Sequence, residues 1–230
     1  MEFESVIRGR RSIRAYKPEP VPEGVVREIL DAARWAPSWR NTQAWNVWVV
    51  SGDALQRYKD EFRAAVERDD PAALDLPATA EWPQACSART AALLKSRAVT
   101  LEAAGEPSDP AAALARMADL FGAPCLLVFG IEDCLAEAYA SFDTGSFVQS
   151  VCLAAYDRGL GTCVVATVVR YPDLLRRLLP GAEGKRFVVS VTLGSPAAGS
   201  PANTFERSRA DLDELATWVS SARPVEPCRC

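Results

Sequence analysis

The chain has 230 residues, of which 49% are hydrophobic and 24% are charged, and its formal net charge is −4. This composition is typical of one large soluble domain or two small ones, and the negative charge argues against a general attraction to nucleic acid or to an anionic membrane. No histidine is present, which excludes Ser–His and Cys–His catalysis.

Cysteine usage and the N-terminus bear on the compartment. The seven cysteines form no paired framework, and nothing at the N-terminus resembles a signal peptide, so we expect a reducing, cytoplasmic location. Cys125, Cys152 and Cys163 lie inside apolar runs and are expected to be buried hydrophobic side chains. Cys228 and Cys230 would give a metal only two ligands, so we expect no metal site.

Apolar periodicity and turn residues predict the elements in chain order. Helices are predicted at 2–9, 22–35, 53–67, 87–105, 110–121, 142–158, 171–179 and from Asp211, which can cap a helix, to about Ser221. Strands are predicted at 46–51, 123–131, 162–169 and 186–194. Strands separated by helices indicate a layered domain, and because no Gly-x-Gly-x-x-Gly follows any strand, it is not a Rossmann fold.

An arginine-rich stretch, "RGRRSIRAY", follows the first helix. If it is extended, Arg10, Ser12 and Arg14 point to one side and Arg11 to the other. Guanidinium forks fit phosphate oxygens and serine adds a neutral donor, so the segment could bind an anion. A solvated basic surface explains the same residues.

A second basic cluster, "FERSRADLDEL", lies near the C-terminus. Arg207 and Arg209 flank a serine just before a predicted helix start, a position that favours anions. Salt bridges to neighbouring acidic residues are the alternative. The two clusters are far apart in sequence but could meet in space.

The stretch "RWAPSWRNTQAWNVWVV" joins the second helix to the first strand. Ser38, Asn41 and Gln43 supply the hydrogen-bonding groups that a flat, polar-edged ring system needs, and Trp39, Trp45 and Trp48 supply apolar area. Core tryptophans followed by a polar loop are the alternative. In "YDRGLGTCVVATV", Gly159 and Gly161 allow a sharp turn from helix to strand and a close backbone approach to a ligand, although a plain helix C-cap explains them as well.

Taken in order, "RRSIRAY", "APSWRNTQAW", "FDTGSFVQSVCLAAYDRGLGTC" and "ERSRADLDEL" resemble the nitroreductase family of FMN-dependent oxidoreductases. The resemblance covers about 1–51 and 123–218. It implies an α+β fold, with a central mixed or antiparallel sheet flanked by helices, in a single nitroreductase-like FMN-binding domain over 1–230. It also implies that the unmatched region, 52–122, is a helical lid over the substrate.

The resemblance implies a set of FMN contacts. They are Arg10, Arg11, Ser12, Arg14, Pro37, Ser38, Trp39, Asn41, Val164, Val165, Ala166, Arg207 and Arg209. Arg10 and the pair 207 and 209 match groups on the phosphate, and Arg14 matches a group near the pyrimidine edge of the ring. The loop at 37–41 matches one that reaches the flavin of the other subunit, and the backbone of 164–166 matches a segment at the reactive edge.

The function implied by the resemblance is electron transfer from NADH or NADPH to a nitroaromatic, a quinone or a similar flat small molecule, by a ping-pong mechanism in an intertwined homodimer. The flavin performs the chemistry, so no catalytic side chain is needed and the missing histidines do not argue against it. The alternatives are a specialised flavin dehydrogenase, dehalogenase or flavin-fragmenting member of the family, a non-catalytic flavin-binding protein, and an anion-binding domain without flavin.

Overall fold

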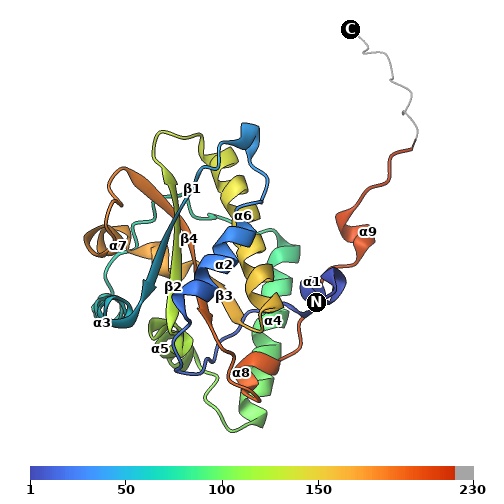
Figure 1. Ribbon diagram of the computed structural model, residues 1–230. Helices are drawn as coiled ribbons and strands as arrows, with labels where there is room; N and C mark the ends of the chain where they lie inside the picture. The colour runs from blue at the N-terminus through green and yellow to red at the C-terminus, as the bar shows by residue number, and fades with distance from the viewer. Residues whose placement is uncertain (221–230) are drawn as a thin grey trace.

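The structure is a computed structural model that describes residues 1–220, with helices on both faces of one four-stranded sheet (Figure 1). The strands, in the spatial order β1-β2-β4-β3, are β1 (Trp45–Ser51), β2 (Cys125–Glu132), β4 (Lys185–Gly194) and β3 (Gly161–Val165). All three neighbouring pairs are antiparallel. The predicted antiparallel sheet flanked by helices is therefore confirmed.

The helices surround this sheet. They are α1 (Phe3–Gly9), α2 (Glu23–Ala33), α3 (Gly52–Glu67), α4 (Gln84–Ala103), α5 (Pro110–Ala118), α6 (Glu137–Asp157), α7 (Pro172–Leu178), α8 (Pro201–Thr204) and α9 (Leu212–Leu215), with short 3₁₀ turns η1 (Trp39–Asn41), η2 (Leu120–Gly122) and η3 (Thr167–Arg170). Within residues 1–220, no helix combines the length and the apolar character needed to cross a bilayer.

Some predicted element boundaries are wrong. The third strand ends at Val165 and its expected continuation is η3, because the valines there are buried and their apolar pattern does not distinguish a strand from a 3₁₀ turn. The last helix covers only Leu212–Leu215, buries no residue and receives no cap bond from Asp211, so packing does not sustain it. Ser221 lies outside the described residues. Helix α6 begins at Glu137, five residues before its predicted start at 142, and α8 was not predicted.

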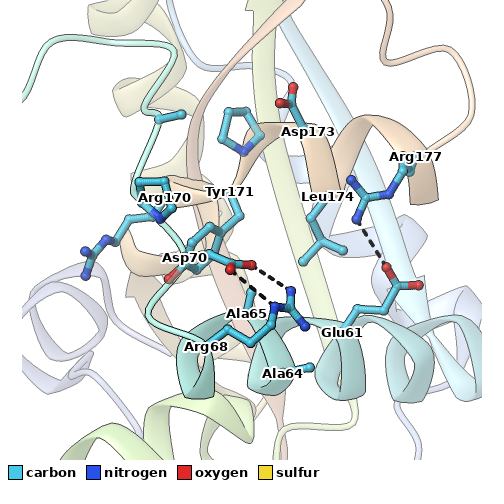
Figure 2. A pocket seen from close by; sticks show the side chains of 13 residues that line it. Glu61, Ala64, Ala65, Arg68, Asp70, Arg170, Tyr171, Asp173, Leu174 and Arg177 are labelled. Atoms are coloured by element: carbon cyan, nitrogen blue, oxygen red, sulfur yellow. Dashed lines mark hydrogen bonds and ion pairs between the residues drawn. The ribbon is translucent and has the colours of Figure 1, made fainter.

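A hollow of about 280 Å³ lies between the end of α3 and the start of α7 (Figure 2). The charged side chains around it are largely paired with one another: Arg68 with Asp70 at 2.6 Å, and Arg177 with Glu61 at 3.4 Å. These contacts satisfy the charges locally, so this hollow has little excess charge with which to attract an ionic ligand.

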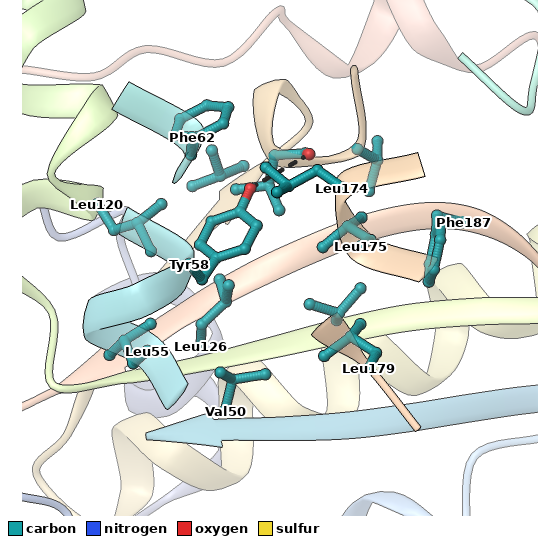
Figure 3. Packing of buried hydrophobic residues seen from close by; sticks show 14 of the residues in the cluster. Val50, Leu55, Tyr58, Phe62, Leu120, Leu126, Leu174, Leu175, Leu179 and Phe187 are labelled. Atoms are coloured by element: carbon teal, nitrogen blue, oxygen red, sulfur yellow. Dashed lines mark hydrogen bonds between the residues drawn. The ribbon is translucent and has the colours of Figure 1, made fainter. Parts of the chain in front are cut away.

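A large apolar cluster fills the space between the sheet and the layer of α3, α5 and α7 (Figure 3). Tyr58 and Phe62 of α3 are almost fully buried there and stack on each other, with ring centroids 5.6 Å apart. Leu126 of β2 and Leu175 of α7 pack in the same cluster. Full burial of such side chains contributes roughly 1.5–3 kcal/mol each, so this cluster is a main source of stability.

A second cluster lies on the opposite face of the sheet, beneath α2 and α6. Strand β2 contributes to both clusters, because Leu126 and Val128 point to one face while Leu127 and Phe129 point to the other. A strand covered on both faces has a continuous apolar sequence, which explains why it was easily predicted. Helix α6 of this face has one part of the candidate site at each of its two ends.

Candidate functional site

The N-terminal arginine segment lies along the edge strand β3. Ile13 donates its backbone N–H to the Thr162 carbonyl at 2.8 Å, and Ser12 forms a parallel bridge with Thr162. A Cβ on Gly161 would lie 2.5 Å from Ile13 Cγ1, so glycine is required for this close approach. Gly159, at φ +75°, ends α6 with left-handed geometry. Each glycine thus has a structural role: one as a helix C-cap, the other in seating the arginine segment.

The C-terminal segment closes over the N-terminal one. The Asn203 side chain accepts hydrogen bonds from the backbone of Arg14 at 2.7 Å and of Ala15 at 3.2 Å, and it donates to the Ala15 carbonyl at 2.8 Å. The Arg207 guanidinium donates to the carbonyls of Arg8 and Arg10. Segments almost 200 residues apart are therefore held side by side, as the sequence suggested they could be.

Three guanidinium groups surround one buried phenyl ring, that of Phe205. Their Cζ atoms lie 5.3 Å (Arg11), 5.6 Å (Arg14) and 5.8 Å (Arg97) from its centroid, and Arg11 also donates to the Phe205 carbonyl. Arg11 and Arg14 therefore both reach the same ring, and the predicted alternation of their side chains along the segment stays a prediction. Only one β-bridge orders this segment, and long arginine side chains can reach the same ring from either side of it.

The charge in this region is uncompensated. Among residues 1–220, no carboxylate forms an ion pair with the arginines at 10, 11, 14, 97 and 207, and the buried Nε atoms of Arg10 and Arg11 have no hydrogen-bond partner. Burial, followed by repulsion from Arg14, lowers the pKa of Arg11. Burial, followed by repulsion from Arg11 and Arg10, lowers the pKa of Arg207. A bound anion would relieve both effects.

The loop at 37–43 is constrained at the other end of α6. Trp39 donates its backbone N–H to the buried carboxylate of Asp143 at 3.0 Å, and Gln43 donates its own to Ser38 Oγ at 3.0 Å. Arg40 and Asn41 have positive φ angles of 51° and 59°. Such strained backbone persists only where its surroundings hold it, and it is enriched at functional sites.

The tryptophans of this stretch support both interpretations of the sequence, a set of core side chains and a ligand-facing surface. Trp45 stacks on Phe147 with centroids 4.7 Å apart, and Trp48 packs edge-on against Phe187 and donates to the Pro180 carbonyl at 2.9 Å. Both are partly buried and pack against the core. Trp39 is 51% exposed and stacks on Tyr139, so it is available to a ligand or a partner.

The expected FMN contacts fall into two groups that a single chain does not bring together. The loop at 37–41 contacts α6 through Asp143, whereas the N-terminus reaches its far end through Met1, whose amino group pairs with Asp157 at 2.6 Å. The 14 helical residues between Asp143 and Asp157 correspond to about 21 Å at about 1.5 Å per residue. Figure 1 shows the same separation, with the loop and α1 at opposite ends of α6.

The third expected contact, 164–166, does lie with the arginines. Val164 and Ala166 are exposed on the edge strand and its continuation, while Val165 is buried in the core. The neighbouring Ser12 bridge to Thr162 places these residues beside the arginine segment. The exposed apolar side chains offer a surface that a flat ring could cover.

Burial lowers the reactivity of three cysteines. Cys125, Cys152 and Cys163 are buried as predicted, and burial raises the pKa of Cys125 from 9.0 to about 12. Burial likewise raises the pKa of the other two thiols. All three therefore stay protonated and unreactive near neutral pH. Cys228 and Cys230 lie outside the described residues.

Comparisons with known proteins identify the family. The model of the nitroreductase family matches residues 7–195, so the chain belongs to that family and the resemblance is confirmed. A nitrobenzene nitroreductase of Ectopseudomonas oleovorans is 32% identical over 226 residues, covering 94% of this chain and 96% of that one. A 4-nitrobenzoate reductase of Nocardioides sp. is 29% identical over 227 residues, covering 94% and 90%.

A solved structure supports the same assignment. The FMN-dependent nitroreductase NfnB of Mycobacterium smegmatis, in complex with NADPH, superposes with a TM-score of 0.85 at 27% identity, covering 94% of this chain and 97% of that one. Because 94% of this chain is covered, the likeness extends into the region 52–122 that the sequence motifs left unmatched.

The residues present fit an FMN phosphate. Within residues 1–220, the buried Nε atoms of Arg10 and Arg11 have no hydrogen-bond partner, and phosphate oxygens are acceptors that suit such guanidinium donors. Sequence reasoning missed Asn203 and Phe205, which hold the arginine segment, although both lie just before the predicted basic pair. It also missed Arg97, because nothing in a helical sequence shows which distant segment one of its side chains will meet.

Proposed function

We propose that the protein is an FMN-dependent oxidoreductase that transfers electrons from NADH or NADPH to a nitroaromatic, a quinone or a similar flat acceptor. The observation that carries the proposal is the unpaired arginine cluster at the edge of β3, in a chain of the nitroreductase family. Arg10, Ser12, Arg207 and Arg209 would hold the phosphate, and Arg14 would lie at the pyrimidine edge. The bound flavin supplies hydride acceptance and donation, and the chain supplies placement.

The site requires a second subunit. The loop that carries Ser38 and Asn41 is held at Asp143, whereas the N-terminus is held at Asp157, about 21 Å farther along α6. Ser38 and Asn41 would therefore reach the flavin held by a partner, not the one held by their own chain. The C-terminal arm also lacks a covering surface: residues 212–220 extend away from the body (Figure 1), and Trp218 and Val219 are 78% and 82% exposed. Exposed apolar residues in such an arm favour an intertwined homodimer.

Mixed dimers test this arrangement. A dimer of one Arg207→Ala subunit and one Asn41→Ala subunit contains one site with both defects and one intact site. We expect it to bind one FMN with wild-type affinity, while each parent homodimer binds two FMN weakly. Two weakened sites, each with one of the two defects, would mean that both residues serve the same chain's flavin. A stable monomer that retains FMN in sedimentation would also overturn the proposal.

Turnover is tested by spectra and steady-state kinetics. Purified protein should be yellow, should be bleached anaerobically by NAD(P)H alone, and should oxidise NAD(P)H in the presence of menadione or nitrobenzene. If donor and acceptor occupy the same face of the ring in turn, double-reciprocal plots at several acceptor concentrations will be parallel. Intersecting lines would mean a ternary complex. A yellow protein without turnover would indicate a flavin carrier or sensor, and a colourless one that gains no colour from added FMN would refute the flavin site.

A further inference from the structure

Helix α6 buries a carboxylate, that of Asp143, beside the loop at 37–43. The residue is 3% exposed, and within residues 1–220 it forms no ion pair. Its hydrogen bond comes from the backbone N–H of Trp39, at 3.0 Å. Burial of a charged group without a cation beside it is costly, and an apolar side chain would fill the same space without that cost. Packing alone therefore does not explain a carboxylate at this position.

The loop beside Asp143 has a strained backbone. Arg40, Asn41 and Gln43 have φ angles of 51°, 59° and 47°, in the left-handed region that residues other than glycine disfavour. All three follow closely on Trp39, the residue whose backbone N–H the carboxylate binds. Because strained backbone persists only where its surroundings determine it, this loop needs an anchor.

Two contacts anchor the loop to one face of α6. Besides the hydrogen bond to Asp143, the Trp39 ring stacks on Tyr139 with centroids 5.1 Å apart. Tyr139 and Asp143 are four residues apart, so they lie one turn apart on the same side of the helix. The two stacked rings are each more than half exposed, whereas Asp143 is buried. The hydrogen bond to Asp143 is therefore the contact that fixes the backbone of the loop.

This anchoring leaves side chains of the loop facing outward. Ser38 closes the loop by accepting the Gln43 N–H at 3.0 Å, and Asn41 is exposed. The proposed function assigns Ser38 and Asn41 to the flavin held by a partner subunit. A loop that is already fixed binds such a ligand without a further loss of conformational entropy, which raises the affinity.

We propose that Asp143 is a positioning residue for the flavin of the partner subunit. Through the Trp39 N–H it holds the loop in the conformation that presents Ser38 and Asn41 across the subunit interface. The proposal rests on the proposed function and adds a residue that acts on the cofactor without touching it. Each α6 then influences the affinity of the other subunit for FMN.

Two substitutions separate the hydrogen bond from the charge. Asp143→Asn keeps an acceptor oxygen for the Trp39 N–H, and Asp143→Ala removes it. We expect Asp143→Ala to weaken FMN binding to the homodimer by about tenfold, followed by flavin fluorescence, and Asp143→Asn to retain most of the wild-type affinity. Equal losses in the two variants would overturn the proposal. So would wild-type affinity in Asp143→Ala, which would leave the proposed function intact.

A double variant tests whether Asp143 acts through the loop. Because Asp143→Ala and Asn41→Ala disturb the same contact with the flavin, their combined effect on FMN affinity should be smaller than the product of their separate effects. A full product would mean that they act independently, which would overturn the proposal. Thr144→Val is the matched control, since Thr144 is fully buried on the same helix and its hydroxyl donates to the Ala140 carbonyl at 2.8 Å. It should leave FMN affinity unchanged, and a loss equal to that of Asp143→Ala would count against a specific role.

A mixed dimer separates positioning from damage to the fold. A dimer of one Asp143→Ala subunit and one Arg207→Ala subunit should contain one intact site and one site with both defects, so it should bind one FMN with wild-type affinity. Damage within the Asp143→Ala subunit would instead weaken the flavin that this subunit holds. Two weakened sites would therefore overturn the proposal.

Amide hydrogen exchange of the Trp39 N–H gives a readout that needs no flavin. We expect slow exchange in the wild type and in Asp143→Asn, and exchange faster by about tenfold or more in Asp143→Ala. If the wild type binds no FMN, the proposed function fails, and the exchange rates still decide whether Asp143 holds the loop. Equal rates in the wild type and Asp143→Ala would overturn the inference whether or not flavin binds.

Discussion

Arg207 offers the most direct test of the phosphate assignment. It is half-buried, donates to the carbonyls of Arg8 and Arg10, and has no carboxylate partner within residues 1–220. A hydrogen bond to a charged group contributes about 1.5–3 kcal/mol. Since about 1.4 kcal/mol corresponds to a tenfold change in affinity, Arg207→Ala should weaken FMN binding by about 10- to 150-fold.

The assay titrates apoprotein with FMN and with riboflavin and follows flavin fluorescence. Because Arg207 also holds the N-terminal segment, its loss could disturb the site without any contact to phosphate. Riboflavin lacks the phosphate, so structural damage would weaken both ligands, whereas a lost phosphate contact would weaken FMN alone. Arg207→Lys, which keeps the charge but not the fork, should fall between wild type and Arg207→Ala. Equal losses for FMN and riboflavin, or no loss for either, would refute the assignment.

Three further predictions concern the fold around the site. Gly161→Ala should displace Ile13, destabilise the protein by about 1–3 kcal/mol and weaken FMN binding. Thermal unfolding and flavin titration measure these two effects. Gly24→Ala is the control, because open space surrounds that glycine, and it should show neither effect. Burial raises the pKa of Cys125 from 9.0 to about 12, so the free energy of unfolding, measured in urea, should fall as pH rises from about 9 to 12, and less steeply in Cys125→Ala. Phe62→Ala should cost about 3–5 kcal/mol by the same urea measurement, since that ring is fully buried.

The sheet was predicted well because buried strands have a recognisable apolar pattern in the local sequence. Strand β2 is covered on both faces and reads as one apolar run, and α2 shows an apolar stripe through Val26 and Ile29 that the structure buries. The predicted boundaries fail where the local apolar pattern is ambiguous or absent. Valines at 168 and 169 are buried in η3 just as they would be in a strand, and α9 buries no residue whose packing would lengthen it.

The candidate site was only partly predictable for a related reason. The arginine motifs at the two ends of the chain could be found by residue type, because several guanidiniums near a serine are unusual whatever their neighbours. Asn203 could not be singled out, since its role depends on the backbone of Arg14 and Ala15, which lie 189 and 188 residues away in sequence. Residue type identifies a group that can bind a ligand, but only the fold shows what holds that group in place.

The distribution of charge connects the fold with the proposed function. The chain has more acidic than basic residues, 30 against 26, so carboxylates were available to neutralise every cluster. They pair instead with arginines on the helix surfaces, such as Arg27 with Glu23 and Arg89 with Glu214, and none neutralises the cluster around Phe205 within residues 1–220. Clustered like charges without counterions destabilise a folded protein, and such an arrangement is typical of a site whose ligand supplies the missing charge.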